Sequence, residues 1–344
     1  MRICVAMSGG VDSSATAYML KKEGHEVFGI TMDLLDNQCF GNQSSILDAK
    51  RVADQLDIEH HFLDLKKEFR KYIIQYFADS YYQGLTPSPC IICNKEIKLG
   101  LLAQKAFELN ADLIVTGHYA NIIETPERVE LHRAKDLIKD QSYFLFAIKK
   151  DILQKLRCPL SNLSKDQTRK LALKAGLDIH QKKDSQDICF VQDGKYQELI
   201  QNLAPKPSKT GSIIDTSGKI LGSHNGIINY TVGQRKGLGI GGGNIYYVTK
   251  IDAKNNQIIV GSKEELLQKS LVINNINWLI DTPSKEFEAM VKLRSRQNLV
   301  PAQISLNSDN TANITLLEDF YGVAPGQGCC IYQSTQVLGG GFIL

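Results

Sequence analysis

The sequence predicts an α/β protein: an open parallel sheet with helices in its N-terminal part, then a small β-rich central domain and a C-terminal β-barrel. Three observations support this prediction. Apolar, β-prone runs alternate with helical patterns from the first residues to about Gly117, which is typical of parallel βαβ units. Pro205 and Pro207 then mark a change of character. Beyond them, short β-prone runs alternate with turn residues, as in small sheets and barrels.

In the first part, the patterns predict four strands with helices between them. The strands are expected at residues 3–7, 27–32, 60–63 and 111–117. A helix that ends at about residue 23 follows the first strand, a helix over 45–56 follows the second, and helical segments follow the third. Ligands of open parallel sheets bind at the carboxyl ends of the strands. We therefore expect the loops after Met7 and Met32, and the segment Thr116–Tyr119, to share one edge of the sheet.

After residue 203 the predicted elements are strands. Residues 246–251 and 257–260, joined by a Lys-Asn-Asn turn, predict a hairpin. Six further runs predict a compact barrel, at residues 273–280, 287–293, 302–306, 312–317, 329–333 and 337–343. We divide the chain into three domains, at residues 1–202, 203–268 and 269–344.

The charge of the whole chain does not by itself indicate nucleic-acid binding. The net charge is +3, from 40 Lys and Arg against 37 Asp and Glu. Between Lys135 and Asp184, however, twelve basic residues stand against six acidic ones, a local excess of +6. Either a solvated helical face or a surface for phosphate backbones has this composition. A helix predicted over 164–175, opened by the capping residues Ser164 and Asp166, lies inside this stretch.

No apolar run approaches the roughly 20 residues of a transmembrane helix, and Met1 leads directly into the first strand. We therefore expect a cytoplasmic protein without membrane association. Eight cysteines among 344 residues do not suggest a disulfide-rich secreted scaffold, so each is judged as core, reactive thiol or ligand. Cys329 and Cys330 lie in a strand-like run, where neighbouring side chains face opposite sides.

The stretch SGGVDSS, residues 8–14, lies between the first predicted strand and the first predicted helix. Gly9 and Gly10 allow a sharp turn, and Asp12 and the serines favour the first turn of a helix, whose free N–H groups attract phosphate. The stretch matches neither the GxxxxGKS/T loop of common NTPases nor GxGxxG. It resembles the pyrophosphate loop (PP-loop) of the ATP-pyrophosphatase superfamily; a plain capped turn is the alternative.

A second glycine-rich run, residues 237–242, matches GxGxxG in letters only. The residues after it, NIYYVTKI, favour a strand and not the helix that a dinucleotide site requires. We expect a flexible basic loop here, carrying Arg235 and Lys236.

Two further segments place cysteines in polar surroundings. TPSPCIICNKEIKLG, residues 86–100, puts Cys90 and Cys93 at the start of a predicted helix beside lysines, a setting that favours the thiolate and hence nucleophilicity or metal ligation. A zinc site would need two more ligands, and the chain has no second CxxC. Cys189, in KKDSQDICFVQDG, follows two lysines in an irregular polar stretch, which is unusual for a core cysteine. Functional and structural roles both remain open for these thiols.

Seven motifs taken together identify a family. Over essentially its whole length, the chain is similar to the bacterial tRNA-specific 2-thiouridylases. The motifs are SGGVDSS, PSPCIICNKEIK, TGHY, KDQSYFL, KKDSQDICF, GQRKGLGIGG and APGQ. The resemblance implies an adenine-nucleotide α-hydrolase-like fold for the catalytic domain 1–202, with a helical part at about 150–185 that contacts tRNA.

The resemblance also implies an activity. Members of the family use ATP to adenylate the C2 oxygen of the wobble uridine of tRNA, position 34, and replace it with sulfur from a cysteine persulfide, which forms 2-thiouridine. The implied partners are tRNAs that accept Lys, Glu or Gln and a sulfur-donor protein downstream of a cysteine desulfurase. We expect a monomer, with ATP and Mg²⁺ as cofactors, and Asp12 helping to place the Mg²⁺.

Carried onto this sequence, the resemblance assigns residues to three roles. The ATP-binding residues are Ala6, Met7, Ser8, Gly9, Gly10, Val11, Asp12, Ser13, Met32 and Gly117. The tRNA-binding residues are Ser88, Pro89, His118, Lys139, Asp140, Gln141, Arg294, Ser295 and Gln327. Cys189 would carry the persulfide, and Cys93 would be the nucleophile that ends in a transient disulfide with Cys189, which must be reduced before the next turnover. The flipped uridine would enter between residues 88–90 and the ATP site.

Cys90 departs from the family pattern, in which many members carry an aspartate thought to act as a base or to position the reactants. A thiol does this less well, so we assign Cys90 an auxiliary role. Cys90, Cys93 and Cys189 could instead hold a [4Fe–4S] cluster whose free iron binds hydrosulfide, which would make sulfur transfer cluster-based. We favour the persulfide route, because Cys93 and Cys189 alone satisfy it.

Two other classes of function are weighed against this one. Another PP-loop ATP-dependent ligase or amidotransferase would also use SGGVDSS, but amination needs an ammonia source such as a glutaminase domain, and none fits in this length. A non-catalytic RNA-binding protein would explain the basic stretch and the barrel, but it leaves the PP-loop without a purpose. ATP turnover that depends on tRNA separates the three classes.

Overall fold

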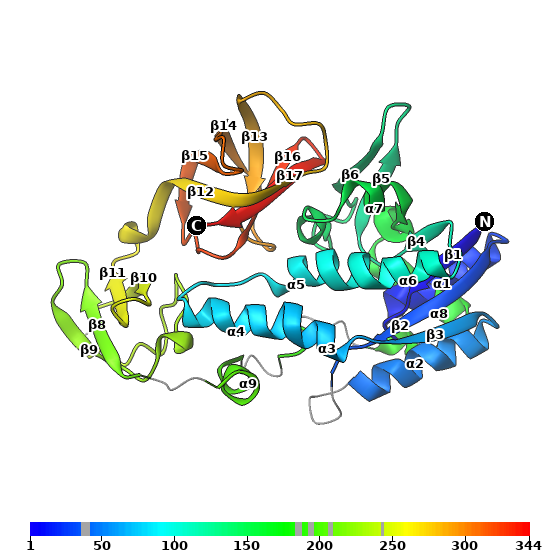
Figure 1. Ribbon diagram of the computed structural model, residues 1–344, viewed down its shortest axis with the longest axis horizontal. Coiled ribbons are helices and arrows are strands. Elements are labelled where there is room, and N and C mark those ends of the chain that lie inside the picture. The colour runs from blue at the N-terminus through cyan, green and yellow to red at the C-terminus, as the bar shows by residue number, and fades with distance from the viewer. Residues whose placement is uncertain (36–41, 183–187, 192–195, 206–208, 242–243) are drawn as a thin grey trace.

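The computed structural model describes residues 1–35, 42–182, 188–191, 196–205, 209–241 and 244–344. Three sheets organise the molecule: a parallel sheet at one end, a small sheet at the other end, and a barrel that lies above the helices between them (Figure 1). Within the described ranges, no helix is long and apolar enough to cross a membrane.

The first sheet is parallel and has five strands in the order β3-β2-β1-β4-β7. These are β1 (Arg2–Ala6), β2 (Glu26–Asp33), β3 (Glu59–Asp64), β4 (Leu113–Val115) and β7 (Leu156–Arg157). The chain runs outward from β1 to β3 and then returns to the other side of β1 as β4. The switch point of the sheet, where ligands of such folds bind, therefore lies between β1 and β4.

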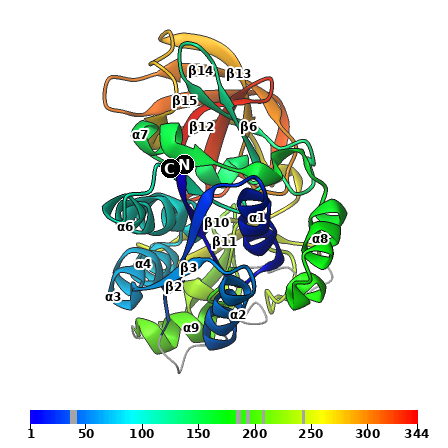
Figure 2. The same cartoon turned by 90° about the vertical axis from the view of Figure 1, so that its right-hand side faces the viewer.

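Helices cover both faces of this sheet (Figure 2). Side chains alternate along β1, so that Ile3 and Val5 pack against one helical layer while Cys4 and Ala6 pack against the other. The first layer contains α1 (Val11–Lys22), α2 (Asn42–Gln55) and α8 (Lys165–Lys174), and the second contains α6 (Ala103–Glu108) and the end of η2 (Cys93–Leu102).

The predicted start of α8 is confirmed. The Ser164 Oγ accepts a hydrogen bond from the Gln167 N–H at 3.3 Å, and the Gln167 side chain accepts one from the Ser164 N–H at 2.7 Å. This reciprocal pair satisfies two N–H groups that a helix start leaves without partners.

Shorter helices connect these layers to the rest of the molecule. They are α3 (Lys66–Phe69), η1 (Arg70–Ile74), α4 (Gln75–Tyr82), α5 (Pro89–Ile92), η3 (Ser142–Leu145), α7 (Lys150–Lys155), η4 (Pro159–Asn162), η5 (Asp178–Gln181), α9 (Tyr196–Leu203), η6 (Ile227–Asn229) and η7 (Glu264–Leu266). Among the described helices, η1 and η2 are π-helices, in which each N–H group donates a hydrogen bond to the carbonyl five residues earlier.

The central sheet has the strand order β10-β11-β8-β9. Its strands are β8 (Gly211–Asp215), β9 (Ile220–His224), β10 (Tyr247–Asp252) and β11 (Gln257–Gly261). The predicted hairpin is confirmed as the antiparallel pair β10 and β11, and Asn256 in its turn has a φ of +52°.

Six antiparallel strands form the predicted barrel, which closes through the pairing of β12 with β17. They are β12 (Leu267–Trp278), β13 (Glu286–Lys292), β14 (Val300–Leu306), β15 (Ala312–Tyr321), β16 (Gly328–Gln333) and β17 (Gln336–Ile343). Cys329 lies in the barrel core, whereas Cys330 faces the core beneath the parallel sheet, so the prediction that they face opposite sides is confirmed. An unpredicted hairpin, β5 (Ala120–Glu124) and β6 (Val129–Arg133), joins the barrel at β17.

Candidate active site

The PP-loop segment, residues 8–14, joins β1 to α1 at the carboxyl edge of the parallel sheet. Gly9 has a φ of +64°, and a Cβ at this residue would lie 2.0 Å from the Ser45 carbonyl oxygen, so glycine is needed for the loop to pack against α2. The Ser13 Oγ accepts a hydrogen bond from the Ser8 N–H at 3.2 Å, which fixes the turn. The loop therefore aims the first turn of α1, with N–H groups that lack helical partners, at this edge.

The loops after β2 and β4 lie on either side of the PP-loop, as predicted. Both strands pair in parallel with β1, so their carboxyl ends meet at one edge. Met32, near the end of β2, is half-buried. Gly117, after β4, packs onto α1, since a Cβ there would lie 2.8 Å from backbone atoms of Asp12 and Ser13. The structure thus gathers the predicted ATP-binding residues, and their contact with ATP stays a prediction.

Asp12 is tied to elements far along the chain. Its two carboxylate oxygens each accept a hydrogen bond from the Lys165 Nζ at 2.7 Å, and Oδ1 accepts another from the Tyr119 hydroxyl at 3.0 Å. The same hydroxyl lies 2.9 Å from the Thr168 Oγ1. Sequence reasoning missed Lys165 and Thr168: the cap at Ser164 signals where α8 begins, but no pattern signals that α8 packs beside α1.

A second lysine braces the PP-loop from the side of α2. The Lys182 Nζ donates to the Gly9 carbonyl at 3.0 Å and to the Asp48 carboxylate at 2.8 Å. Lys182 opens the motif KKDSQDICF, whose residues 183–187 lie outside the described residues. The beginning of this motif therefore contacts the PP-loop, while its end carries Cys189.

Cys90 and Cys93 lie on a helical segment that changes its pitch between them. Cys90 belongs to α5, and Cys93 begins the π-helix η2. A spacing of three residues places the two thiols on one helix face. The i→i+5 register of η2 then places Lys98 one π-turn beyond Cys93. Lys98 was not predicted as a site residue, because the sequence pattern does not reveal a π-helix.

The structure brings Cys189 to the same place. Ile188, Phe190 and Val191 belong to the apolar cluster that also includes Cys93. The three thiols lie near enough to Lys98, and Cys189 near enough to Cys90 and Cys93, for charges on these groups to interact. The predicted grouping of the three thiols is therefore present.

Burial controls the protonation of these thiols. It raises the pKa of Cys93 to about 11 and that of Cys189 to about 12, and it raises the pKa of Cys90 as well. Cys189 keeps contact with solvent although protein surrounds it on most sides. The positive charge of Lys98 lowers all three pKa values, but by less than burial raises them. Lys98 thus favours the thiolates, as expected of a nearby lysine, but desolvation is the larger effect, so the net shift in the free protein favours the protonated thiols.

Two metal groups were predicted for this site: a [4Fe–4S] cluster at the three thiols, as an alternative, and Mg²⁺ at the PP-loop. Across the described parts of the chain, no three His, Cys, Asp or Glu side chains are arranged to hold a metal ion, and a [4Fe–4S] cluster on Cys90, Cys93 and Cys189 stays an alternative prediction. Mg²⁺ bound mainly through phosphates needs only one or two carboxylates. Asp12 supplies one at the PP-loop, where it is paired with Lys165.

Gln327, a predicted tRNA-binding residue, links the barrel to the segment before the thiols. Its Nε2 donates to the carbonyls of Thr86 at 2.9 Å and Pro87 at 3.3 Å, and its Oε1 accepts from the Ser88 hydroxyl at 3.2 Å. Ser88 and Pro89 are buried, and α5 follows directly. The barrel therefore helps to set the position of the helix that carries Cys90 and Cys93.

Other predicted tRNA-binding residues also make internal contacts. Asp140 is buried and accepts hydrogen bonds from the Ala134 N–H at 3.1 Å and the Ser142 hydroxyl at 3.1 Å. Arg294 donates to the Gly322 carbonyl at 2.7 Å, and burial lowers its pKa. Such contacts shape the surface around the thiols.

Four predicted tRNA-binding residues remain: His118, Lys139, Gln141 and Ser295. His118 is buried, its Nδ1 lies 2.8 Å from the Thr116 Oγ1, and burial holds its pKa well below the usual range, so it is neutral. Lys139, Gln141 and Ser295 are half-buried. Contact with tRNA stays a prediction for all nine residues.

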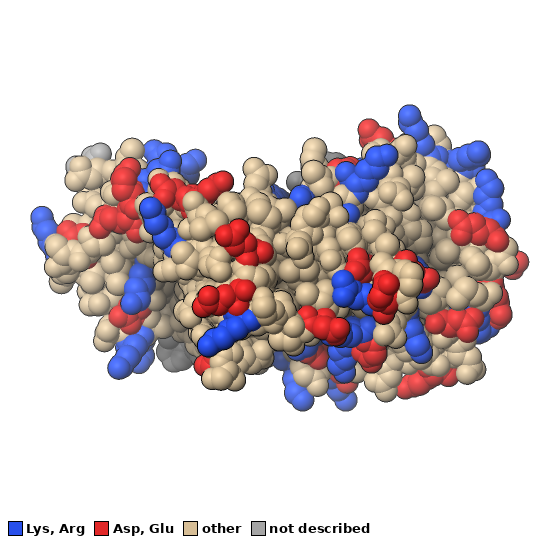
Figure 3. Space-filling view, turned by 90° about the horizontal axis from the view of Figure 1, so that it is seen from above, with Lys and Arg blue, Asp and Glu red and all other residues tan. Residues whose placement is uncertain are grey.

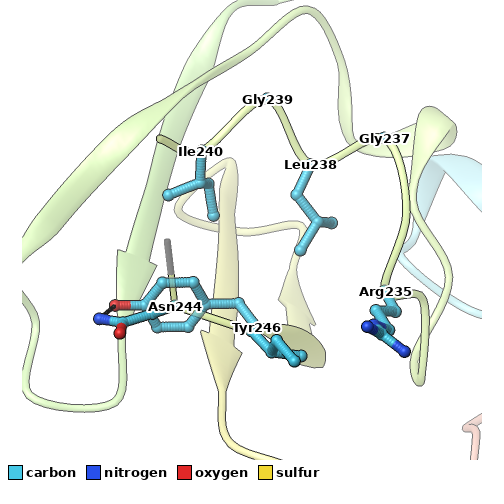
Figure 4. A pocket seen from close by; sticks show the side chains of 8 residues that line it. Arg235, Gly237, Leu238, Gly239, Ile240, Asn244 and Tyr246 are labelled. Carbon is cyan, nitrogen blue, oxygen red and sulfur yellow. Dashed lines mark hydrogen bonds between the residues drawn. The ribbon is translucent and has the colours of Figure 1, made fainter. Parts of the chain in front are cut away.

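The glycine-rich run at residues 237–242 does not form a dinucleotide site, as expected, because the strand β10 follows it and not a helix. Leu238 and Ile240 point from this loop toward Tyr246, with Arg235 at one side (Figure 4). These residues line a shallow pocket of about 260 Å³ in the central sheet region.

Comparison with known proteins places the chain in a family. Three family models match it: the tRNA methyl transferase HUP domain over residues 1–193, the tRNA methyl transferase PRC-barrel domain over 198–262, and the aminomethyltransferase beta-barrel domain over 268–343. A tRNA-specific 2-thiouridylase MnmA from Rickettsia africae is 47% identical over 351 residues, covering 99% of this chain and 96% of the relative. The chain belongs to the tRNA-specific 2-thiouridylase family. The family predicted from the seven motifs is therefore confirmed.

A second full-length relative agrees with this family, and a solved structure of low identity is also similar to part of the chain. The 2-thiouridylase of Rhodospirillum centenum is 44% identical over 359 residues and covers 100% of this chain and 91% of its own. A solved U34-tRNA thiolase from Methanococcus maripaludis with its [4Fe-4S] cluster is 16% identical, has a TM-score of 0.39, and covers 59% of this chain and 65% of its own. A likeness this low carries no argument about the thiols of this family member.

Proposed function

We propose that this 2-thiouridylase-family chain uses ATP to replace the C2 oxygen of uridine 34 in tRNA with sulfur. The observation that carries the proposal is that a PP-loop borders a group of three thiols. Met32, beside the PP-loop, packs against the apolar cluster that includes Cys93 and Phe190. A site suited to activating an oxygen thus adjoins a site suited to delivering sulfur. The names of the full-length relatives support the choice of substrate and reaction.

In the first step, the C2 oxygen of the uridine attacks the α-phosphorus of ATP, and pyrophosphate leaves. The N–H groups at the start of α1 suit the phosphates, because they lack helical partners and carry partial positive charge. Asp12 would hold Mg²⁺ together with phosphate oxygens, and the ion would offset part of the negative charge. The uridine C2 then carries AMP as a leaving group.

In the second step, the terminal sulfur of a Cys189 persulfide attacks C2, and AMP leaves. The Cys93 thiolate attacks the Cys189 Sγ, which breaks the persulfide S–S bond and leaves that electron pair on the sulfur now joined to C2. The product is 2-thiouridine together with a disulfide between Cys93 and Cys189. A two-electron thiol reductant restores both cysteines. Cys93 must lose its thiol proton before it attacks, which its raised pKa opposes, and the terminal persulfide sulfur must lose its own proton before it attacks C2.

The proposed partners follow from these steps. A donor protein must pass persulfide sulfur to Cys189, which contacts solvent and is therefore open to such a transfer. We place the reaction in the cytoplasm, where tRNA and thiol reductants are present, and we propose that the enzyme acts as a monomer. ATP is proposed to contact residues 6–13, Met32 and Gly117, and tRNA is proposed to contact residues 88–89, His118, residues 139–141, residues 294–295 and Gln327.

The experiment that tests this function measures AMP release that depends on tRNA. Asp12→Ala and Ser13→Ala should each abolish AMP release, because both residues shape the first turn of α1, while tRNA affinity stays nearly unchanged. Unchanged AMP release by either variant would contradict the role of the PP-loop. ATP turnover that ignores tRNA would favour a different PP-loop ligase, and tRNA binding without any ATP turnover would favour a non-catalytic RNA-binding protein.

A further inference from the structure

Lys165 lies at the PP-loop, although no motif predicts it there. We propose that Lys165 is a phosphate-binding residue of the nucleotide site: Asp12 holds its ammonium group over the first turn of α1, and the ammonium passes from that carboxylate to the pyrophosphate part of ATP when the nucleotide binds. This inference rests on the proposed use of ATP and adds to it a residue that recognises the substrate.

The position of the ammonium group is well defined. Its Nζ lies 2.7 Å from both oxygens of the Asp12 carboxylate, and the Lys165 side chain is only 13% exposed. Asp12 is also held by the Tyr119 hydroxyl, so the carboxylate that receives Lys165 is itself fixed. The lysine thus reaches from the first residue of α8 to the second residue of α1.

The charges around this ion pair suit an added anion. The start of α1 and the start of α8 both carry partial positive charge, which makes a lysine between them unfavourable unless anions are near. A second ammonium group, that of Lys182, donates to the Gly9 carbonyl in the same loop. Among the described residues, Asp12 is a carboxylate partner of Lys165, and Asp48 is one of Lys182. Pyrophosphate would bring negative charge to a place where two helix starts and two ammonium groups meet.

A purely structural role for the ion pair is the competing explanation. In that case Lys165 would serve only to hold α8 against α1. Apolar contacts already join these helices, because Ala172 of α8 lies in the same buried cluster as Val11 and Ala15 of α1. The ion pair is therefore not the main attachment between them.

The test measures the affinity for inorganic pyrophosphate by calorimetry in metal-free buffer. Lys165→Met should weaken binding by about tenfold to a hundredfold, the usual effect of losing a hydrogen bond to a charged group. Lys165→Arg, which keeps the charge, should stay within a few-fold of wild type. Lys170→Met is the matched control, since Lys170 is an exposed lysine on the same helix and its loss changes the net charge equally. We expect no change for this control.

Asp12→Asn separates the two explanations. If Lys165 binds phosphate, removing its carboxylate partner frees the ammonium group, so metal-free pyrophosphate binding should stay equal or tighten. If the ion pair only holds the helices together, Lys165→Met and Asp12→Asn should weaken binding and lower the melting temperature to the same extent. That result would overturn the inference, as would unchanged binding by Lys165→Met or an absence of pyrophosphate binding by the wild type.

These outcomes are distinct from failure of the proposed function. Loss of tRNA-dependent AMP release in the wild-type enzyme would contradict the function, whatever Lys165 does. Normal AMP release with normal pyrophosphate binding in Lys165→Met would contradict only the inference about Lys165.

Discussion

Cys90 lies one helical turn before Cys93, but the persulfide route uses only Cys93 and Cys189. We therefore predict that Cys93→Ser and Cys189→Ser each abolish thiolation, because each removes a sulfur that takes part in bond exchange. Cys90→Ser should retain measurable activity in iron-free enzyme. Single-turnover thiolation assays of the three variants check this.

Evidence for a functional iron–sulfur cluster would contradict this prediction for the three cysteines. If anaerobically purified enzyme holds a stoichiometric [4Fe–4S] cluster, all three variants are equally inactive, and the iron-free protein stays inactive even with a persulfide donor, the cluster route is correct.

The buried His118 should make the free energy of unfolding depend on pH. Burial keeps its folded-state pKa well below the unfolded value of about 6.5. Between these values the unfolded state binds a proton that the folded state does not, so stability falls as the pH falls below about 6.5. The loss approaches about 1.4 kcal/mol per pH unit from this residue.

The variant His118→Gln tests the linkage. Gln keeps a polar group beside Thr116 but does not titrate, so the free energy of unfolding in urea should fall less steeply for the variant between pH 7 and pH 5 than for wild type. His60 and His224, whose pKa values burial also lowers, remain in both proteins and act as an internal reference. Parallel pH profiles for the two proteins would contradict the assignment.

At the scale of elements, the close contact between the loop after β4 and the start of α1 holds the PP-loop in place. Gly117→Ala would place a Cβ 2.8 Å from the backbone of Asp12 and Ser13, which forces the two apart. We predict a loss of about 1–3 kcal/mol in the free energy of unfolding, as in other overpacked sites, and at least tenfold weaker ATP binding by calorimetry. Gly222→Ala is the control, because its Cβ would meet no atom within 4 Å, and it should change stability by less than about 0.5 kcal/mol. Equal effects of the two variants would show that the contact is unimportant.

The elements also show what sequence alone could predict. The strand, loop and helix around residues 2–22 follow from local patterns, as does the cap of α8 at Ser164, because neighbouring residues determine them. The π-helix η2 was not predictable, since no local pattern distinguishes it from an α-helix, and it is this register that places Lys98 beside Cys93. The pairing of Lys165 with Asp12 was also missed, because it joins residues 153 positions apart.

At the scale of the molecule, the site spans two separate parts of the chain. Gln327 of the barrel bonds the Thr86 carbonyl, 241 residues earlier, just before the helix with Cys90 and Cys93. The motif APGQ could be matched to the family from sequence, but its internal role could not, because chain distance hides this contact. The barrel itself was predictable from the spacing of its strands.

The charge distribution of the molecule predicts how tRNA binding responds to salt. Lys and Arg are mixed with Asp and Glu on the face seen from above, and no single basic field covers it (Figure 3). We predict a log–log slope of about −0.7 to −0.9 for each phosphate contacted by the +6 stretch between Lys135 and Asp184. Lys149→Gln, an exposed residue in this stretch, should reduce the slope by about one contact, whereas Lys219→Gln, exposed on the central sheet, should not. Filter binding over a series of salt concentrations measures this, and a salt-independent affinity would show that the stretch is only a solvated face.

The most direct test of the persulfide route is a single turnover with iron-free enzyme whose Cys189 has been loaded as a persulfide. With ATP and tRNA, the persulfide route predicts equal amounts of AMP and of 2-thiouridine, located at position 34 by mass spectrometry of the anticodon-loop fragment. It also predicts a disulfide between Cys93 and Cys189 in the spent enzyme. AMP without 2-thiouridine, or 2-thiouridine formed equally well by Cys189→Ser, would contradict it.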